Sequence, residues 1–201
     1  MTGLRSRQKQ ERRAKIAEAA LKVFSRNGFM AATLEQIATE AGVSPPTVTN
    51  YYGSKQEILL ALLNAPDERS IRENRATLMH RDPIEALCAI ELRVAENQLA
   101  TMPASLWREL APFWLQGELS EVFQPWNDMV IAEIRHIFSH YQESGQFRQD
   151  LDVEVTARLF NDIMNLGFLR LASAPVPNFV AHEANSRVII ELFCRGMLAK
   201  S

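Results

Sequence analysis

The chain has 201 residues, of which 47% are hydrophobic and only two are cysteines. It is long enough to bury a core without disulfides or a structural metal. No run approaches the ~18 uncharged apolar residues of a membrane-spanning helix, and no apolar block follows the basic amino-terminal residues, so we expect a cytoplasmic protein that does not enter the membrane. Cys88 and Cys194 lack the paired spacing of a zinc or redox motif, which predicts buried thiols.

The charge is unevenly distributed along the chain. Residues 1–60 hold nine Lys and Arg against five Asp and Glu, an excess of four positive charges, whereas the remaining residues hold thirteen against nineteen, an excess of six negative charges. Such a basic amino-terminal part is compatible with a polyanionic partner. A solvated basic helix face would have the same composition, so charge alone does not decide between the two.

The spacing of apolar residues is helical nearly everywhere, which predicts an all-α fold. Asn27 and Gly28 supply a left-handed stop for the first helix, and Thr33 with Gln36 forms a capping-box pattern at the start of the second. The expected helices span residues 8–27, 34–41, 46–52, 54–64, 83–100, 103–116, 125–143, 152–173 and 178–199.

The stretch "AGVSPPTVTNYYGSK", residues 41–55, predicts a very short helix after a tight glycine turn. Proline costs little in a first turn, where amides have no intrahelical partner, and Ser44 is a suitable cap. Because Pro46 restricts the residue before it, we expect the first regular turn at Pro46. Val48 and Tyr52 face inward in this pattern. Two short helices joined in this way are typical of a helix-turn-helix, although an ordinary helical corner is the alternative.

The longer segment "AALKVFSRNGFMAATLEQIATEAGVSPPTVTNYYGSKQEILLALL", residues 19–63, resembles the tetracycline-repressor (TetR) family of bacterial transcriptional regulators. Further along, "SGQFRQDLDVEVTARL" is similar to a common family segment. The resemblance implies a three-helix, operator-binding head over residues 1–53 and a larger helical body over residues 54–201, with helix 54–64 connecting them. It also implies a homodimer bound to a double-stranded DNA operator, with a small-molecule effector and the dimer interface in the body.

The residues that face outward on the third helix are the candidates for DNA contact. Asn can pair with adenine and the Thr methyl group can contact thymine, so we hypothesise that A·T pairs matter in each half-site. The family usually has Tyr where this chain has Thr49, which is a departure from its pattern. The resemblance makes Thr33 and Lys55 phosphate contacts. The complete candidate set is Thr33, Ser44, Thr47, Thr49, Asn50, Tyr51 and Lys55.

The last two helices are apolar on more than one side, which indicates a two-fold four-helix bundle, with a central place in the monomer core as the alternative. The predicted interface residues are Ile163, Gly167, Val188, Leu192 and Gly196. Aromatic and Met side chains at helical spacing between the two indicate either core or an effector pocket. The candidate pocket residues are Trp107, Phe113, Trp114, Phe123, Trp126 and Met129.

Glu133, His136 and His140 share one helical face, but without a second cluster this pattern is more typical of a solvated face than of a metal site. We therefore expect no metal and no cofactor, and no catalytic set is recognisable. The favoured function is a repressor released from its operator by a small, largely apolar or aromatic effector. The alternatives are a DNA-binding adaptor whose body binds a protein, and a metal-dependent helical enzyme using these three residues.

Overall fold

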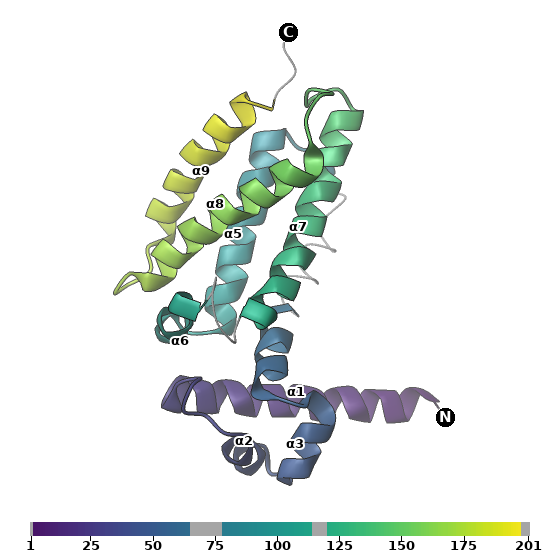
Figure 1. The fold of residues 1–201 in the computed structure, drawn as a ribbon, viewed down its shortest axis with the longest axis vertical. Coiled ribbons are helices and arrows are strands. Elements are labelled where there is room, and N and C mark those ends of the chain that lie inside the picture. The colour runs from purple at the N-terminus through teal and green to yellow at the C-terminus, as the bar shows by residue number, and fades with distance from the viewer. Residues whose placement is uncertain (1, 65–77, 114–119, 198–201) are drawn as a thin grey trace.

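The computed structural model describes residues 2–64, 78–113 and 120–197, and every regular element in these ranges is a helix, which confirms the all-α prediction. Figure 1 shows α1, α2 and α3 at one end of the molecule, here called the head, and α5 to α9 at the other, here called the body. The elements are α1 (Thr2–Asn27), α2 (Leu34–Ala41), α3 (Pro45–Tyr52), α5 (Pro83–Thr101), α6 (Ala104–Leu110), the 3₁₀ turn η1 (Ala111–Phe113), α7 (Ser120–Glu143), α8 (Val153–Ser173) and α9 (Phe179–Arg195), with residues 55–64 forming a helix that connects the two parts.

The head is organised around α1, which lies across the other two helices (Figure 1). The apolar stripe of α1, which comprises Ile16, Ala20, Val23 and Phe24, is buried, and Phe24 makes an edge-to-face contact with Phe29 at a centroid distance of 5.0 Å. Ile37 of α2 and Val48 of α3 are fully buried in the same core. Burial of one apolar face per helix against α1 holds two helices that are too short to be stable alone.

The cap predicted at Thr33 is confirmed, whereas the Ser44 side chain does not cap α3. Thr33 and Gln36 form a reciprocal capping box at the start of α2, and Gly42 ends that helix with a φ of 64°. In the body, the Asp82 carboxylate accepts hydrogen bonds from two amides of the first turn of α5. Asp152 and Asn178 cap α8 and α9 in the same way, each accepting one amide hydrogen bond. Local side-chain chemistry therefore sets these helix starts.

Three predicted helix starts are wrong. The first helix begins at Thr2 and not at residue 8, because Gln, Lys and Arg are good helix formers and nothing before residue 8 breaks the pattern. The third begins at Pro45 and not at Pro46, with both prolines in its first turn. α7 begins at Ser120, so that Pro125 lies inside the helix and not at its start. A proline there removes one backbone hydrogen bond near the amino-terminal end.

Two predicted helix ends are also wrong. The helix expected over residues 103–116 ends as α6 at Leu110 and passes into the 3₁₀ turn η1, which contains Pro112; residues 114–116 lie outside the described residues. α9 ends at Arg195 and not at residue 199. After Gly196 the chain leaves the helical path, and the Met197 carbonyl accepts a hydrogen bond from the Arg148 amide at 2.9 Å.

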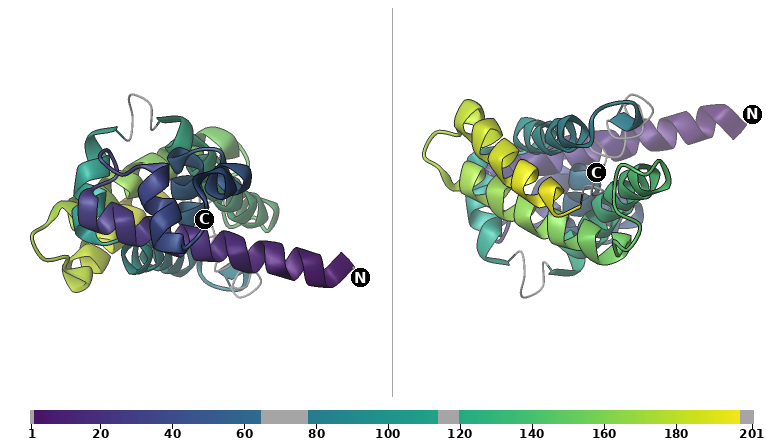
Figure 2. Two further views of the ribbon diagram at one scale, coloured as in Figure 1. Left: turned by 90° about the horizontal axis from the view of Figure 1, so that it is seen from below. Right: turned by 90° about the horizontal axis from the view of Figure 1, so that it is seen from above.

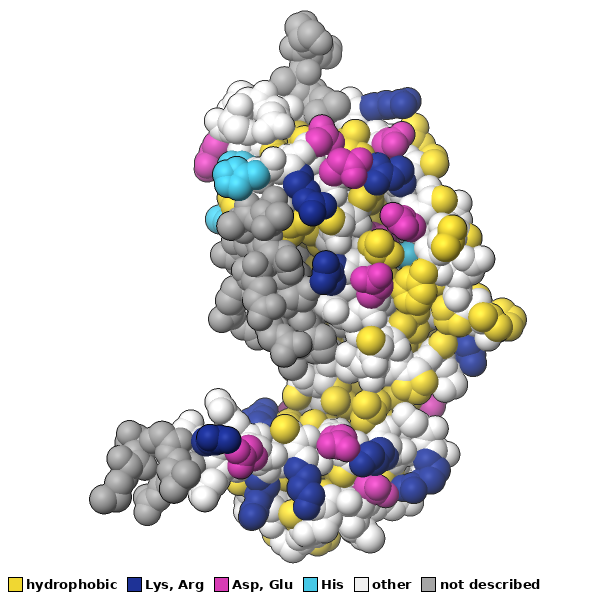
Figure 3. All heavy atoms as spheres, turned by 180° about the vertical axis from the view of Figure 1, so that it is seen from behind, with side chains coloured by type: hydrophobic (Ala, Val, Ile, Leu, Met, Phe, Trp, Pro, Cys, Tyr) yellow, Lys and Arg dark blue, Asp and Glu magenta, His cyan; other side chains and the backbone are white. Residues whose placement is uncertain are grey.

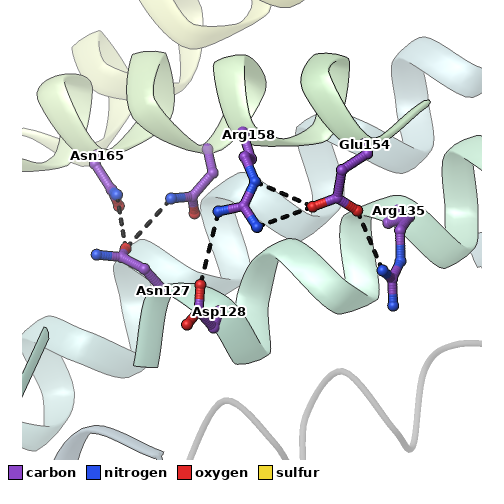
Figure 4. Close-up of polar contacts among 7 residues, drawn as sticks. Asn127, Asp128, Arg135, Glu154, Arg158 and Asn165 are labelled. Carbon is purple, nitrogen blue, oxygen red and sulfur yellow. Dashed lines mark hydrogen bonds and ion pairs between the residues drawn. The ribbon is translucent and has the colours of Figure 1, made fainter. Parts of the chain in front are cut away.

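The body packs α8 between its neighbours: it contacts α6, α7 and α9, while α5 contacts α9 (Figure 2). Aromatic rings fill the interior, and Trp107 of α6 meets Phe168 of α8 edge to face at 4.9 Å. Polar contacts fix the α7–α8 packing along one side, as Figure 4 shows. There Arg158 of α8 pairs with Glu154 at 2.9 Å, and Glu154 also pairs with Arg135 of α7 at 3.1 Å.

Both cysteines are buried in the body and free. Burial raises the pKa of Cys88 to about 11 and that of Cys194 to about 12, so that both remain protonated thiols at neutral pH. The predicted buried thiols are thus confirmed. Within the described ranges, none of the helices has the length and apolar character required to cross a bilayer.

The turn between α1 and α2, residues 28–32, joins the head to the body. The Glu109 carboxylate of α6 accepts hydrogen bonds from the amides of Phe29, at 3.2 Å, and of Met30, at 3.0 Å. From the other side, Lys55 Nζ donates to the carbonyls of Phe29, Met30 and Ala32 at 2.9, 2.9 and 3.1 Å. We call this arrangement the turn clasp. One side chain from the body and one from the connecting helix thus satisfy the backbone groups of a single turn.

We predict that Gly28→Ala destabilises the protein more than Gly145→Ala does. Both glycines have positive φ, 81° and 76°, so each substitution incurs a left-handed backbone strain of roughly 1–2 kcal/mol. At Gly28 a Cβ would also lie 2.9 Å from Glu109 Oε2, whereas at Gly145 it meets nothing within 4 Å. Displacing Glu109 from its two amides adds about 1–2 kcal/mol. Urea denaturation measures both variants, and equal losses would contradict the role of Glu109.

Candidate nucleic-acid interface and ligand cavity

The third helix has the inward and outward faces that were predicted. Val48 and Tyr52 are buried, with exposures of 0% and 3%. Thr49 and Asn50 are exposed, and Tyr51 is half-buried. The Asn50 side chain is exposed on the outward side of α3, and its amide makes no hydrogen bond among the described residues. Both donor and acceptor of that amide are therefore available to an external partner.

The hydroxyl groups around α3 are already in local hydrogen bonds. Thr49 Oγ1 donates to the Pro45 carbonyl of the preceding turn at 3.3 Å. Ser44 is the residue before the helix, as predicted, but its side chain caps no amide, because Pro46 has no N–H group and the Thr47 amide donates to the Ser44 carbonyl at 2.9 Å. Instead Ser44 Oγ lies 2.9 Å from Thr47 Oγ1. A partner of these hydroxyls would therefore share them with the protein.

A groove between α1 and α3 brings Tyr51 beside the basic residues of α1. Its lining includes Lys9, Arg12 and Lys15, which make no ion pair among the described residues. Glu11 also lines the groove, but its carboxylate pairs with Arg7 at 2.9 Å. Figure 3 shows Lys and Arg side chains gathered over the head. Three uncompensated cations next to the outward side of α3 make this groove suited to an anion such as a phosphodiester backbone.

Tyr52 fastens α3 to α1. Its hydroxyl donates to the Arg13 carbonyl at 2.9 Å, and the Arg13 guanidinium lies 4.4 Å from the centre of its ring. Burial raises the pKa of the Tyr52 hydroxyl above its ordinary value. The hydroxyl therefore stays protonated and keeps its donated hydrogen bond at neutral pH. This contact ties α3 to α1.

The two predicted phosphate contacts are engaged within the protein. Thr33 Oγ1 accepts the Gln36 amide in the capping box at 3.3 Å, and Lys55 belongs to the turn clasp. Lys55 Nζ also lies 4.9 Å from the centre of the Phe29 ring. The position of Lys55 near a helix start was visible from the sequence, but the carbonyls that it binds are about 25 residues away. Their contact with DNA stays a prediction.

An apolar face lies along α8 and α9. Val188 and Leu192, two of the predicted interface residues, are 58% and 61% exposed, and Leu159 and Leu166 of α8 are 50% and 51% exposed. Ile163 and Gly167 are half-buried, and Gly196 is exposed beyond the end of α9. Figure 3 shows hydrophobic side chains along this flank of the body. Large exposed apolar side chains on two adjacent helices are unusual on a free surface and indicate a partner.

The body contains a cavity of about 30 Å³ between α5, α7 and α8, room for about one water molecule. Only Trp126 of the predicted pocket residues lines it. Trp107 and Phe123 are fully buried elsewhere in the core, and Met129 packs against that core. Trp114 and the side chain of Phe113 lie outside the described residues. The lining residues are Ile90, Glu91, Val94, Ala95, Trp126, Val130, Ile134, Phe160, Asn161, Met164, Asn165 and Phe168.

The polar lining residues were not predicted. Asn161 and Asn165 of α8 both donate to Asn127 Oδ1 of α7, at 3.3 and 2.8 Å (Figure 4). Glu91 of α5 is 6% exposed. An acid in the middle of an otherwise apolar helix pattern is the one signal that could have drawn attention to this site. Which helix would face Glu91 could not be inferred without the fold.

The face with Glu133, His136 and His140 lies on α7. One ring nitrogen of His140 lies 3.0 Å from the Met79 carbonyl, and its ring meets Tyr141 edge to face. In the part of the chain that the structure describes, no three His, Cys, Asp or Glu side chains come close enough to hold a metal ion. His140 is thus occupied by packing within the body.

We predict that Lys55→Met lowers the free energy of unfolding in the absence of DNA, on the order of 2 kcal/mol, because three carbonyls of the turn clasp lose a charged donor. Lys9→Met is the matched control, since Lys9 is exposed and lines the groove. Its stability should remain within about 0.5 kcal/mol of the parent. Thermal denaturation checks both, and an unchanged Lys55→Met protein would show that the clasp contributes nothing.

Comparison with known proteins places the chain among bacterial regulators. The model of the bacterial regulatory proteins, tetR family, matches residues 16–62, which include α2, α3 and most of the connecting helix. The HTH-type transcriptional regulator BetI of Rhizobium meliloti is 31% identical over 114 residues, 55% of this chain and about half, 54%, of that protein. The HTH-type transcriptional repressor NicS of Pseudomonas putida is 28% identical over 156 residues, 75% of this chain and 72% of that one.

The likeness extends to the body in solved structures. Thermus thermophilus FadR, a TetR-family transcriptional repressor solved in complex with lauroyl-CoA, superposes with a TM-score of 0.67 at 25% identity, covering 94% of this chain and 96% of that one. These relatives are regulators and not enzymes, which confirms the expectation of a non-catalytic protein. The head matches the family model over residues 16–62, and the whole chain superposes on a TetR-family repressor, so that head and body both resemble the TetR family of bacterial regulatory proteins.

Proposed function

We propose that the protein is a transcriptional repressor that binds a two-fold operator as a homodimer and is released by a small, largely apolar or aromatic effector. The observation that carries the proposal is the exposed amide of Asn50 on α3, which has no hydrogen bond to any described residue, beside a groove lined by three cations without ion pairs to described residues. The repressor relatives named above support the sign of regulation, and the lauroyl-CoA complex of FadR supports a small-molecule effector.

Base reading and phosphate binding fall to different residues in this proposal. The prolines at the start of α3 offer neither a polar side chain nor an amide donor, so Asn50 is the main reader of bases, with Thr47 and Thr49 beside it. Lys9, Arg12 and Lys15 contact phosphates, with Tyr51 of α3 in the same groove. Lys55 holds the turn clasp and thereby positions the head. Phosphate contacts fix the register of α3, and base contacts select the sequence.

The effector signal passes through α6. Two adjacent residues of that short helix contact the head and α8. Glu109 binds the head through the turn clasp, and Arg108 donates to the Ala174 carbonyl at the end of α8 at 3.2 Å. Trp107, which precedes Arg108, packs on Phe168, and Phe168 lines the cavity. A shift of α8 on effector binding therefore moves the point at which the head is held. Moving the operator equilibrium a hundredfold in each direction requires about 5.5 kcal/mol of preference for the released form.

A protein-binding adaptor is the second candidate, because the cavity is small and the α8–α9 face is apolar. Both proposals use that face, and they differ in its occupant. In a homodimer, the α8–α9 face of one copy packs against the same face of the second copy. Both faces are then buried in a closed, two-fold pair. The homodimer therefore accounts for the exposed apolar side chains without another protein.

We predict that Asn50→Ala weakens binding only to half-sites in which an A·T pair lies at its contact, by about 1–3 kcal/mol. Arg12→Ala is expected to weaken binding to all sequences equally and to reduce the slope of log K against log salt by about 1. Fluorescence anisotropy on DNA selected from genomic fragments measures both variants over a salt series. Uniform weakening by Asn50→Ala would show that this residue only positions the protein.

We predict that Leu192→Glu dissociates the dimer, because it places a charge in the middle of the apolar α8–α9 face. Ala132→Glu adds the same charge to an exposed position of α7 and serves as the control. Sedimentation equilibrium should show a dimerisation constant weakened by more than about 100-fold for the first variant and unchanged for the second. A dimer that survives Leu192→Glu would place the interface elsewhere.

A further inference from the structure

The ionisable group that lines the cavity is acidic. Glu91 is the only ionisable side chain among its described lining residues; the other polar groups are the neutral amides of Asn161 and Asn165. No Lys, Arg or His of the described residues lines it. A ligand that placed a carboxylate or phosphate inside would add a second negative charge to an apolar space without a cation, which is strongly unfavourable. The lining therefore selects against anionic groups and in favour of cationic ones.

The carboxylate of Glu91 has one ion-pair partner among the described residues. Its partner is His182 of α9, with 2.7 Å between His182 Nε2 and Glu91 Oε1, and the two side chains are 6% and 3% exposed. Despite this distance, the ring nitrogen makes no hydrogen bond of acceptable direction. His182 lies away from the cavity, in the groove between α8 and α9. A buried carboxylate with one misaligned partner gains from a better donor, and the cavity is the side from which a ligand can offer one.

We infer that the effector is a cationic amine, with an apolar or aromatic body packed against Trp126, Phe160 and Phe168 and its ammonium group on the Glu91 carboxylate. This inference rests on the proposed function, since it names the class of ligand for the same cavity. Asn161 and Asn165 also line the cavity, and because their Nδ2 atoms donate to Asn127, their side-chain oxygens are the groups that would accept further N–H groups of the amine. An ammonium group on a carboxylate within an apolar cavity forms a charge-assisted hydrogen bond, roughly twice as strong as a neutral one.

The closed cavity must widen to admit such a molecule, because 30 Å³ holds only about one water. Two wall elements allow this. Met164 has an unbranched, flexible side chain, and Pro125, beside Trp126, leaves α7 without one backbone hydrogen bond. The ammonium group also competes with His182 for Glu91, so that ligand binding loosens the contact between α5 and α9. The ligand is thereby coupled to the helix that carries part of the α8–α9 face.

The test uses the full-length protein without DNA and three matched ligand sets, each with one apolar body and three end groups. The sets are 2-phenylethylammonium, 2-phenylethanol and phenylacetate; octylammonium, octanol and octanoate; and 2-naphthylmethylammonium, 2-naphthalenemethanol and 2-naphthoate. Isothermal titration calorimetry measures affinity, and the ligand-induced rise in Tm provides a second readout. In at least one set, the ammonium compound is expected to bind about tenfold or more tightly than the alcohol, with the carboxylate weakest.

Three variants separate the ligand contact from folding. Glu91→Gln should remove the preference for the ammonium compound, whereas Glu96→Gln removes the same charge from an exposed position of α5 and should change nothing. Should Glu91→Gln fail to fold, Asn165→Asp adds a carboxylate to the cavity and should tighten ammonium binding. The inference is overturned if a carboxylate binds more tightly than its matched ammonium compound, if Glu91→Gln or Asn165→Asp leaves the ammonium affinity unchanged, or if none of the three ammonium compounds binds.

Failure of this inference and failure of the proposed function give different results. Ligand affinity is measured without DNA, so operator binding that is released by a neutral or anionic compound would overturn only the cationic class. A protein that binds the ammonium compounds through Glu91 but has no operator would overturn the proposed repressor and leave the ligand class standing. Anisotropy on the selected operator, with and without each compound, distinguishes the two.

Discussion

The hold of Glu109 on two backbone amides of the turn at residues 28–32 is the contact on which the arrangement of head and body depends. A turn that leaves amides and carbonyls without partners is costly when it is partly buried, and this one is satisfied from outside itself. Glu109 is negatively charged and binds amides of the turn, whereas the positively charged Lys55 donates to carbonyls of the same turn. α1 ends just before this turn and α2 begins just after it. Any movement of α6 or of the connecting helix is therefore transmitted to both helices.

In addition to a continuous apolar core, close and directional contacts couple the parts of the body. Arg108 and Glu109 of α6 bind the end of α8 and the head, and Gln98 of α5 donates to the Leu63 carbonyl of the connecting helix at 3.3 Å. Trp107 Nε1 in turn donates to the Gln98 carbonyl at 3.2 Å. Packed helices joined in this way move as units.

The stability of the head and its freedom to bind are separated along the chain. Tyr52 and the α1 stripe hold α3 in place through buried groups, while Asn50, two residues before Tyr52, is exposed and makes no hydrogen bond to the part of the chain that the structure describes. This separation follows from the helical repeat, which turns neighbouring side chains about 100° apart. A helix of eight residues can therefore be anchored by two residues and still present others to a partner.

By itself, the sequence determined the helical class and the inward and outward sides of α3, because both follow from apolar periodicity. It also determined where four helices start, because these starts depend on side chains within four residues of one another; they lie at Thr33, Asp82, Asp152 and Asn178. It did not determine the extent of α1 or the position of Pro125 inside α7, where neighbouring helices override weak local preferences. Only the tertiary structure decided that Lys55 and Glu109 meet at one turn and that Glu91 faces the cavity beside Asn161. These contacts join residues about 25 to 80 positions apart, and their partners are set by helix packing, on which local sequence carries no information.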